Sequence, residues 1–597
     1  MAVMALGCGS AMAETLELVG QLGGSTDTVV LQGSYLYMNQ GPRLVVVDVS
    51  VPARPEVRGT FPFPGVVNSI AVRGEFLYAA VEASGLWVLD VSDPANPRAV
   101  GHRETNHVPW GMEAVGTLLH TATMRYGLEI FDISNPGEPV PVGSCDTPGS
   151  ACDLALAGRY AYVADWSGGL RVIDVGDPRA PREVGAFPTP SYTYGVAVAG
   201  RYAYLATAKD GLIVVDVSDP GAPYQVGAYT DTGLVQCVAV AGGFVYLGDT
   251  GPAFHILDVS DPTAPTEVGN YAVSGSPQKV ALSDGLAYVA SAEAGLRVID
   301  VRDPAAPAEI GALTTLGDAA HLAVSVSGDR AYVAGQWGNL WAVDMSDPSA
   351  PSLLGRFRTH DSATAPAVAG LESEPYLVMA TTRLRVIEVS DPSLLREVAS
   401  LHIGARVDGL TISGEHVYLA ASELLVVDLV PPSAPVVVGS CDTPGRPQDV
   451  VVRGRYAYVA DGTAGLTVVD VADPVAPKVV GNCPVPGEAI SLAVAGDYVY
   501  LGTFNAGLRV IDVRDPASPV EVSTHDHPRR VRDVVAAGGM AYVADGRVYT
   551  LDMSDPTSPR EAGTLWVPGN AVAVATAGEY LYVACRDGGL VILRKSL

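Results

Sequence analysis

Side chains able to bind a ligand recur at a nearly constant interval along this chain of 597 residues. Asn68 and Trp110 lie 42 residues apart, as do Tyr194 and Gln236. Amide groups can hydrogen-bond to a sugar or a peptide, and aromatic rings can stack against it. The alternative is that these residues only decorate a solvated rim. The full set of candidate ligand-binding residues is Asn68, Trp110, Tyr194, Gln236, Gln278, His321, Asp408, Gln448 and Arg532.

Carboxylates at or beside the same positions raise a second possibility, which is catalysis. Asp408, Asp449 and Asp533 would serve a hydrolase or lyase acting on a glycan if two of them faced each other with at least one shifted pKa. The chain contains no His-Glu-x-x-His, no Gly-x-Ser-x-Gly and no phosphate-binding glycine loop. We therefore assign no catalytic residue and expect no cofactor.

The element that must position these side chains is a short apolar run closed by an acidic residue, as in Leu170–Asp174. Its closing residue recurs at intervals of 40 to 44 residues, and a last copy ends in Arg594, which makes fourteen copies. Such a period is typical of the four-stranded blades of a β-propeller. The closing residues are Asp48, Asp90, Asp132, Asp174, Asp216, Asp258, Asp300, Asp344, Glu388, Asp428, Asp470, Asp512 and Asp552.

Each copy has the pattern of short strands separated by turns. The fourth copy predicts strands at Tyr160–Ala164, Leu170–Val175 and Glu183–Phe187, and Tyr194–Ala199 begins the next copy. Both faces of these strands are apolar, as expected for sheets packed on both sides. The Asp-x-Ser-Asp-Pro element that follows many copies, as at Asp90–Pro94, is interpreted as a structural turn in which the aspartates accept backbone amides.

The repeated run resembles that of the LVIVD-repeat family, with LVVVD at Leu44–Asp48, LIVVD at Leu212–Asp216 and LTVVD at Leu466–Asp470. The resemblance covers nearly the whole chain. It implies an all-β fold of tandem β-propellers and a surface or secreted protein, and it implies no single activity. The copy near Glu388 departs from the pattern, because Glu replaces Asp and Leu395 replaces a proline.

Fourteen copies exceed one ring, so we expect two seven-bladed propellers at residues 14–303 and 304–597, with a split of eight and six as the alternative. Leu16–Leu22 has the pattern of a fourth strand without the first three. We expect it to complete the seventh blade, and Pro307–Leu313 to complete the fourteenth, so that each ring is closed by its own N-terminal strand.

The formal net charge of −28 argues against nucleic acid or an anionic membrane surface as a partner. Solubility is the simplest explanation for the acidic balance, and a cation-binding surface is the alternative. No Asp-x-Asp-x-Asp-Gly calcium loop supports that alternative.

Residues 1–13 have the pattern of a remnant bacterial export signal. Ala5–Cys8 resembles a lipoprotein processing box that would lipidate Cys8, and Ala11–Ala13 fits ordinary signal cleavage. A start codon placed too late would explain the missing basic residues. The alternative is a chance apolar N-terminus on a cytoplasmic protein. We expect an extracytoplasmic protein, with membrane contact only through this anchor.

Cysteines and histidines predict one disulfide and no metal site. Cys145 and Cys152 flank a connection between two copies and could form a disulfide in an exported protein. Neither His102 with His107 nor His525 with His527 has further ligands nearby in the sequence. The favoured interpretation is thus a non-catalytic exported scaffold that binds a protein or glycan at the cell envelope, and the alternative is a propeller enzyme acting on a glycan.

Overall fold

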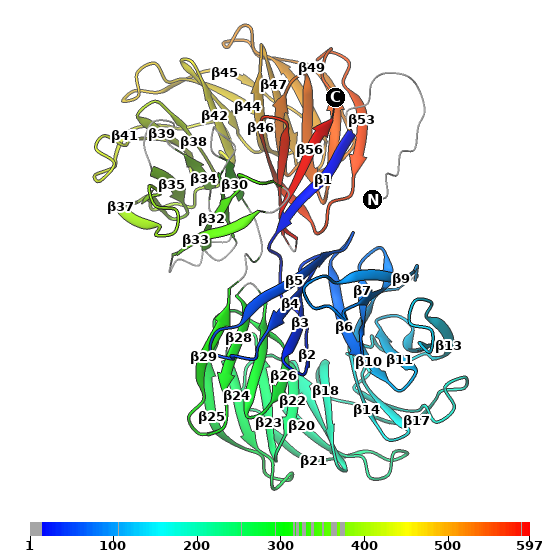
Figure 1. Ribbon diagram of the computed structural model, residues 1–597. Helices are drawn as coiled ribbons and strands as arrows, with labels where there is room; N and C mark the ends of the chain where they lie inside the picture. The colour runs from blue at the N-terminus through cyan, green and yellow to red at the C-terminus, as the bar shows by residue number, and fades with distance from the viewer. Residues whose placement is uncertain are drawn as a thin grey trace. The chain divides into compact units, whose positions relative to one another are not determined.

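The computed structural model is built from β-strands (Figure 1). Within the described residues, the strands form fourteen four-stranded antiparallel sheets, and no helix occurs. The prediction of an all-β chain made of four-stranded blades is therefore confirmed. The structure describes residues 15–105, 107–251, 253–292, 294–314, 317, 321–324, 330–335, 339–348, 351–359, 367–370, 376–586 and 588–596.

One sheet represents the repeated unit. It contains β14 (Asp153–Ala157), β15 (Tyr160–Ala164), β16 (Leu170–Asp174) and β17 (Arg182–Phe187), paired in sequence order. Gly169 directly precedes β16 and has a φ of 75°, and a Cβ there would lie 2.3 Å from the carbonyl oxygen of Phe187, so the turn requires glycine. The strands predicted for this copy agree with these bounds to within one residue.

The hydrophobic core lies between neighbouring sheets. Tyr162, Leu170 and Val172 of one sheet pack against Leu205 and Ile213 of the next. Because each sheet has a neighbour on both sides, both faces of the middle strands are buried, as the continuous apolar runs predicted.

The Asp-x-Ser-Asp-Pro element is a structural turn, as predicted. Asp90 Oδ1 accepts the backbone N–H of Ser92 at 2.9 Å, and Asp93 Oδ1 accepts that of Ala95 at 3.0 Å. Hydrogen bonds from the side chain and then the backbone of Ser92 hold the pKa of Asp90 below its usual range. Hydrogen bonds from the Asn96 side chain and then the Ala95 backbone lower the pKa of Asp93 in the same way. The same arrangement recurs at Asp216 and Asp258.

A glycine in the fourth strand lets this turn approach from the next sheet. A Cβ on Gly185 would lie 2.1 Å from the carbonyl oxygen of Pro220, and one on Gly311 would lie 2.2 Å from that of Pro52. No side chain fits in such a space. The glycine thus sets the distance between consecutive sheets, and Gly311 sets the distance between the seventh sheet and the first.

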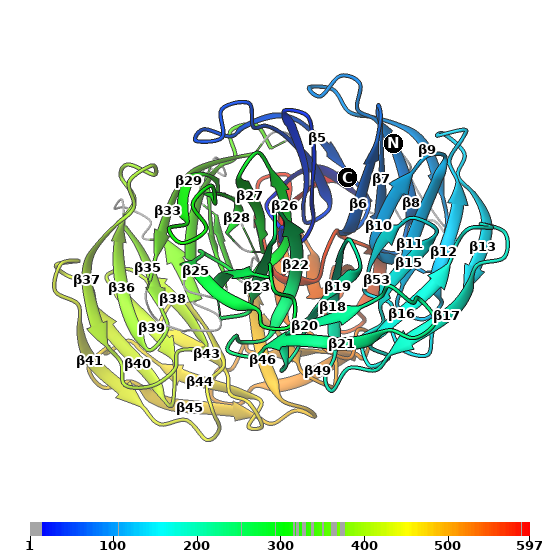
Figure 2. The same ribbon diagram turned by 90° about the horizontal axis from the view of Figure 1, so that it is seen from below.

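The chain divides into two compact units: Gly23–Gly317, and Asp318–Leu597 together with the N-terminal residues up to Leu22. In each unit the first strands of the sheets lie side by side in a closed cycle around the centre (Figures 1 and 2). The inner strands of the first unit are β2 (Val29–Gln32), β6 (Val67–Arg73), β10 (Pro109–Val115), β14, β18 (Thr193–Ala199), β22 (Val235–Ala241) and β26 (Pro277–Ser283). Those of the second unit are β30 (His321–Val324), β34 (Ala367–Gly370), β38 (Gly409–Ser413), β42 (Asp449–Arg453), β46 (Ala489–Ala495), β50 (Asp533–Ala537) and β54 (Ala571–Ala577).

The predicted closure of the two rings is wrong. β1 (Thr15–Leu22) pairs with β56 (Gly589–Ser596) in the last sheet, and not with the seventh sheet. β29 (Ala308–Leu313) completes the seventh sheet by pairing with β28 (Gly295–Asp300). The connection between β28 and β29 is short, so closing it costs less conformational entropy than bringing a distant strand to the same edge. The boundary therefore lies after Leu313, and the expected domains 14–303 and 304–597 are shifted accordingly.

Candidate binding face and channel carboxylates

The predicted residues of the first unit share an unusual backbone position. Asn68, Trp110, Tyr194, Gln236 and Gln278 each lie at the β-bulge that opens an inner strand, where the register between the first and second strands shifts. A bulged residue has no opposite partner in the ladder, and its side chain is redirected relative to a regular strand. The regular interval of these residues is thus the interval of the bulges.

These five side chains differ in their exposure to solvent and in their hydrogen-bond partners. Trp110 is 51% exposed. The other four are half-buried. Gln278 donates to the side chain of Ser276 at 3.1 Å, while the Oε1 atom of Gln236 is buried and has no partner within the described residues. The set therefore contains one exposed ring and one unused hydrogen-bond acceptor.

The remaining predicted residues lie in the second unit. Asp408, Gln448 and Arg532 each directly precede an inner strand and donate their backbone N–H to the end of the second strand, at 2.8 to 2.9 Å. His321 is the first residue of β30, and its side chain lies outside the described residues. Cys8 also lies outside them.

Two stacked ring pairs lie at the same end of the sheets as Trp110. The rings of His107 and Tyr126 are 3.5 Å apart between centroids, and those of Trp166 and Tyr192 are 4.5 Å apart. In each pair one ring comes from the connection into an inner strand and the other from the hairpin between the second and third strands. An antiparallel sheet brings these two loops to one edge. Sequence reasoning missed the pairs because it followed only one position in each repeat.

We call the side chains of Trp110, Tyr126, His107, Trp166 and Tyr192 the aromatic face. Tyr126 is 45% exposed and Tyr192 is 46% exposed. Trp166 has a φ of 44°, a left-handed conformation that a bulky residue adopts only when its surroundings enforce it. Its carbonyl oxygen accepts the backbone N–H of Thr193 at 3.0 Å, which ties the hairpin to the next sheet.

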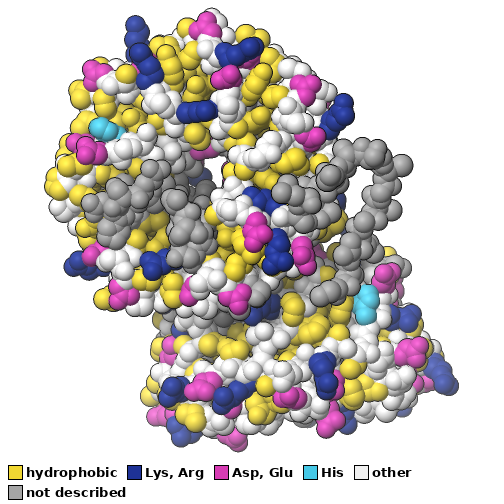
Figure 3. Space-filling model, turned by 45° about the horizontal axis from the view of Figure 1, so that its top comes forward, with side chains coloured by type: hydrophobic (Ala, Val, Ile, Leu, Met, Phe, Trp, Pro, Cys, Tyr) yellow, Lys and Arg dark blue, Asp and Glu magenta, His cyan; other side chains and the backbone are white. Residues whose placement is uncertain are grey.

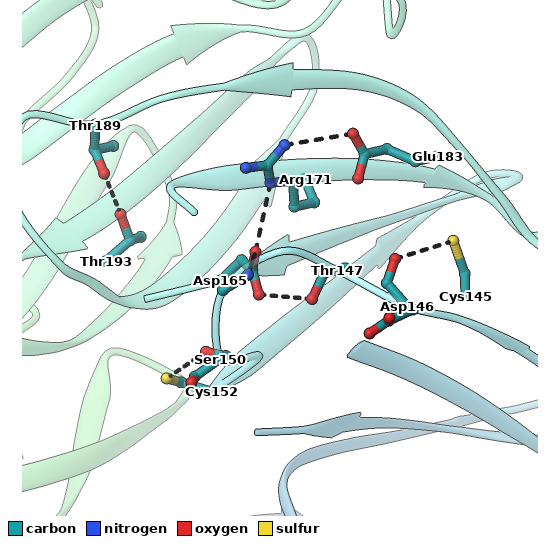
Figure 4. Close-up of polar contacts among 11 residues, drawn as sticks. Cys145, Asp146, Thr147, Ser150, Cys152, Asp165, Arg171, Glu183, Thr189 and Thr193 are labelled. Carbon is teal, nitrogen blue, oxygen red and sulfur yellow. Dashed lines mark hydrogen bonds and ion pairs between the residues drawn. The ribbon is translucent and has the colours of Figure 1, made fainter. Parts of the chain in front are cut away.

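A buried aspartate fixes the loop beside this face (Figure 4). Asp165 accepts a hydrogen bond from the Thr147 hydroxyl at 2.6 Å and one from the Gly149 backbone N–H at 2.8 Å, and Arg171 lies 3.5 Å away. Burial raises the pKa of Asp165 despite these partners. Asp461 holds the equivalent loop of the second unit through Thr443, at 2.7 Å, in the same way. These loops are held in one conformation before any ligand binds.

The predicted disulfide between Cys145 and Cys152 is not formed. Both thiols are free, and their sulfurs approach different carbonyl oxygens, those of Asp146 and Ser150 (Figure 4). Thr147 and Gly149, in the loop between the two cysteines, both donate hydrogen bonds to Asp165. Burial raises the pKa of Cys152 to about 12, so its reactive thiolate form is suppressed.

An ion pair lies inside the first unit. Lys279 Nζ on β26 is 2.9 Å from Asp153 Oδ1 on β14, three sheets away in the cycle. Glu113 on β10 is close to both, and burial raises its pKa. Its carboxylate accepts the backbone N–H of Leu156 at 2.9 Å. Sequence reasoning missed this charged bridge between inner strands because Lys279 lies one position beyond the recurring set.

The carboxylates of the second unit have separate partners. Asp408 lies 2.7 Å from Arg406 and 2.8 Å from Arg446. Asp449 accepts the backbone N–H of Leu492 at 3.1 Å, and Asp533 accepts that of Val574 at 2.8 Å.

The pKa values of Asp449 and Asp533 lie above the ordinary range for aspartate. Burial and the charge of Asp533 raise the pKa of Asp449 to about 7, and burial raises the pKa of Asp533 to about 6. Each of the two carboxylates joins its inner strand to the inner strand of the following sheet. Asp153 accepts the same kind of hydrogen bond, from the backbone N–H of Val196, in the first unit. The bond between neighbouring inner strands is therefore a repeated structural feature, and in the second unit it involves two aspartates with raised pKa values.

Other kinds of site are not evident in the described part of the chain. It contains no group of three side chains suited to hold a metal ion. No helix among the described residues is long and apolar enough to span a membrane. Acidic and basic side chains are interspersed among apolar ones on the face shown in Figure 3.

Repeated four-stranded sheets arranged side by side around a centre define a protein of the β-propeller type, with its binding candidates on the loops at one end. Models of the LVIVD repeat match the chain thirteen times between residues 23 and 593, and the chain belongs to the LVIVD-repeat family. Residues 360–403 carry no match, although β36 (Arg383–Glu388) and β37 (Arg396–His402) of that copy still form their sheet. No curated protein matches the chain.

Proposed function

We propose that this protein is a non-catalytic scaffold of the cell envelope that binds a glycan or a protein through the aromatic face of its first unit. The observation that carries the proposal is the placement of Trp110 and two stacked ring pairs on loops at one end of the sheets. Exposed, immobilised rings supply contact area at a small entropic cost, which suits both sugars and protein segments.

The location at the envelope is supported by the residues before β1. Ala5–Cys8 resembles a lipoprotein processing box, and the proposal places a lipid anchor at Cys8. The net charge of −28 disfavours nucleic acid as the partner. We therefore expect an extracytoplasmic glycan or envelope protein.

The test is affinity capture from an envelope extract with residues 14–597 as bait. A matched bait carries Trp110→Ala, Tyr126→Ala and Tyr192→Ala, the three most exposed rings of the aromatic face. A control bait carries Val100→Ala, Val140→Ala and Tyr224→Ala, which are exposed residues of outer strands. A glycan or protein retained by the original and control baits and lost by the matched bait supports the proposal. Equal retention by all three contradicts it.

The alternative is an enzyme that acts on a glycan in the second unit. Asp449 and Asp533 favour it, because the pKa of each carboxyl group is raised toward the range in which an acid or base works. Their bonds to backbone amides favour the structural role. Turnover of a glycan that is abolished by Asp449→Asn in a folded protein would establish the enzyme.

A further inference from the structure

Three arginines gather at one end of the second unit. Arg530 and Arg532 precede β50, and Arg586 follows β55 (Tyr580–Cys585). They come from the connection into one sheet and from a hairpin of the next. Burial, and then the charges of Arg530 and Arg586, lower the pKa of Arg532. Arg532 donates its backbone N–H to the carbonyl oxygen of Ala544 at 2.9 Å, and Arg586 donates its own to that of Asn570 at 2.9 Å. Both loops therefore lie at the end of their sheets where the inner strands begin.

The cluster has too few acceptors. Asp545, at the end of β51 (Met540–Asp545), holds its Oδ1 atom 3.9 Å from Nε of Arg532, beyond hydrogen-bond distance. The Nε atoms of Arg530 and Arg532 are buried and have no hydrogen-bond partner in the described part of the chain. A buried cationic N–H without an acceptor is costly, and a bound anion would remove that cost.

Arg530 of the cluster, and Arg547 at the start of β52 (Arg547–Asp552), each stack on an exposed aromatic ring. The guanidinium carbon of Arg530 lies 4.3 Å from the centre of the Phe504 ring, and that of Arg547 lies 3.3 Å from the centre of the Trp566 ring. A guanidinium stacked on a ring keeps its N–H edge free for an anion. Phe504 is 45% exposed and Trp566 is 63% exposed, so a ligand can reach this edge from solvent.

We propose that Arg530, Arg532 and Arg586 form an anion-binding site for a small oxyanion. The ligand group is a carboxylate, sulfate or phosphate, either free or as a single charged group of a sugar. Planar arginine forks match the geometry of these groups and bind them by charge-assisted hydrogen bonds. A long polyanion is disfavoured because the chain carries a net charge of −28. The site is independent of the aromatic face, which lies in the other unit.

The experiment is isothermal titration calorimetry on the full chain at low ionic strength. The probes are inorganic sulfate, inorganic phosphate and galacturonate, with galactose as the uncharged comparison. The variants are Arg532→Gln and Arg586→Gln, and the exposed Arg586 keeps the test valid if the Arg532 variant folds poorly. Arg455→Gln is the matched control, because it removes the same charge from the ion pair with Asp470 and away from the cluster.

We expect saturable binding of at least one anion and none of galactose. Affinity should fall about tenfold or more in both cluster variants and stay within about twofold in Arg455→Gln. Tighter binding of galacturonate than of sulfate and phosphate assigns the group to a sugar acid, and the reverse assigns it to a free inorganic anion. The proposal is overturned if none of the three anions binds saturably, or if Arg455→Gln weakens binding as much as Arg586→Gln.

Discussion

Lys279 and Asp153 form an ion pair of 2.9 Å although 126 residues separate them. They come from the seventh and fourth sheets of the first unit, so the bond connects nearly opposite sides of the cycle of inner strands. The charges of Asp153 and Glu113 keep the pKa of Lys279 raised although burial lowers it. The amine balances two carboxylates that would otherwise repel each other.

Replacing Lys279 with methionine should destabilise the first unit. Asp153 and Glu113 would keep their positions without a counter-charge, and we expect a loss of about 1–2 kcal/mol, since the amine is partly exposed and its attraction is screened. Chemical denaturation of Lys279→Met, compared with Lys209→Met on an exposed hairpin, measures the effect. Equal stability of the two variants would show that the ion pair contributes nothing.

The second unit should lose stability as the pH rises from about 4 to about 7. The folded pKa values of Asp449 and Asp533 are about 7 and about 6, well above the ordinary value of an aspartate. Between these pH values the folded state therefore retains protons that the unfolded state has released, and the free energy of unfolding falls as the pH rises. The unit is most stable below the pKa of the unfolded aspartates, and the loss is complete once the pH exceeds the pKa values of the folded state. We expect a loss of about 2 kcal/mol or more.

The same prediction has a direct control. In Asp449→Asn the pH dependence of the denaturant midpoint of this unit should become shallower. The reverse trend in the original protein, with stability rising between these pH values, would contradict the assigned protonation.

Removing β1 should destabilise the second unit and leave the first unchanged. Deleting residues 1–22 exposes the edge of β56, which pairs with β1 from Thr15↔Ser596 to Leu22↔Leu590. Differential scanning calorimetry should then show one of two transitions at lower temperature. Deletion of residues 1–14 alone is the control. A shift in the transition of the first unit would contradict the observed pairing.

Gly185→Ala should disturb the contact between the fourth and fifth sheets. The new methyl group would lie 2.1 Å from the carbonyl oxygen of Pro220, so the backbone must move, at a cost of about 2–3 kcal/mol. Gly221→Ala is the matched control, because its nearest neighbour would be 3.4 Å away. A thermal unfolding midpoint that falls equally in both variants would contradict the steric explanation.

The strands could be predicted from the sequence because their causes are local. Tyr160–Ala164 alternates over five residues between turn signals, and the structure gives it the predicted bounds. The turn role of Asp90 also followed from its immediate neighbours. The interval of Asn68 and Trp110 indicated a shared position, although only the structure shows that the position is a β-bulge.

What could not be predicted depends on distant parts of the chain. Leu16–Leu22 has the pattern of a fourth strand for any incomplete sheet, and nothing within it identifies β56 as its partner. Lys279 and Asp153 meet only because the cycle of sheets closes. Arg532 and Arg586 come from different connections, so their shared position depends on how neighbouring sheets pack. Cys145 and Cys152 are near in sequence, but the contacts of Asp165 occupy the loop between them.

The pairing of β1 with β56 makes the two units unequal in the stretch of chain that each needs in order to fold. The unit Gly23–Gly317 is one continuous segment and has all of its strands by Leu313. β1 finds its partner only in β56, which ends at Ser596. The first unit is thus inserted in sequence within the second, and the last sheet of the second unit cannot be completed until both sides of that insertion are present.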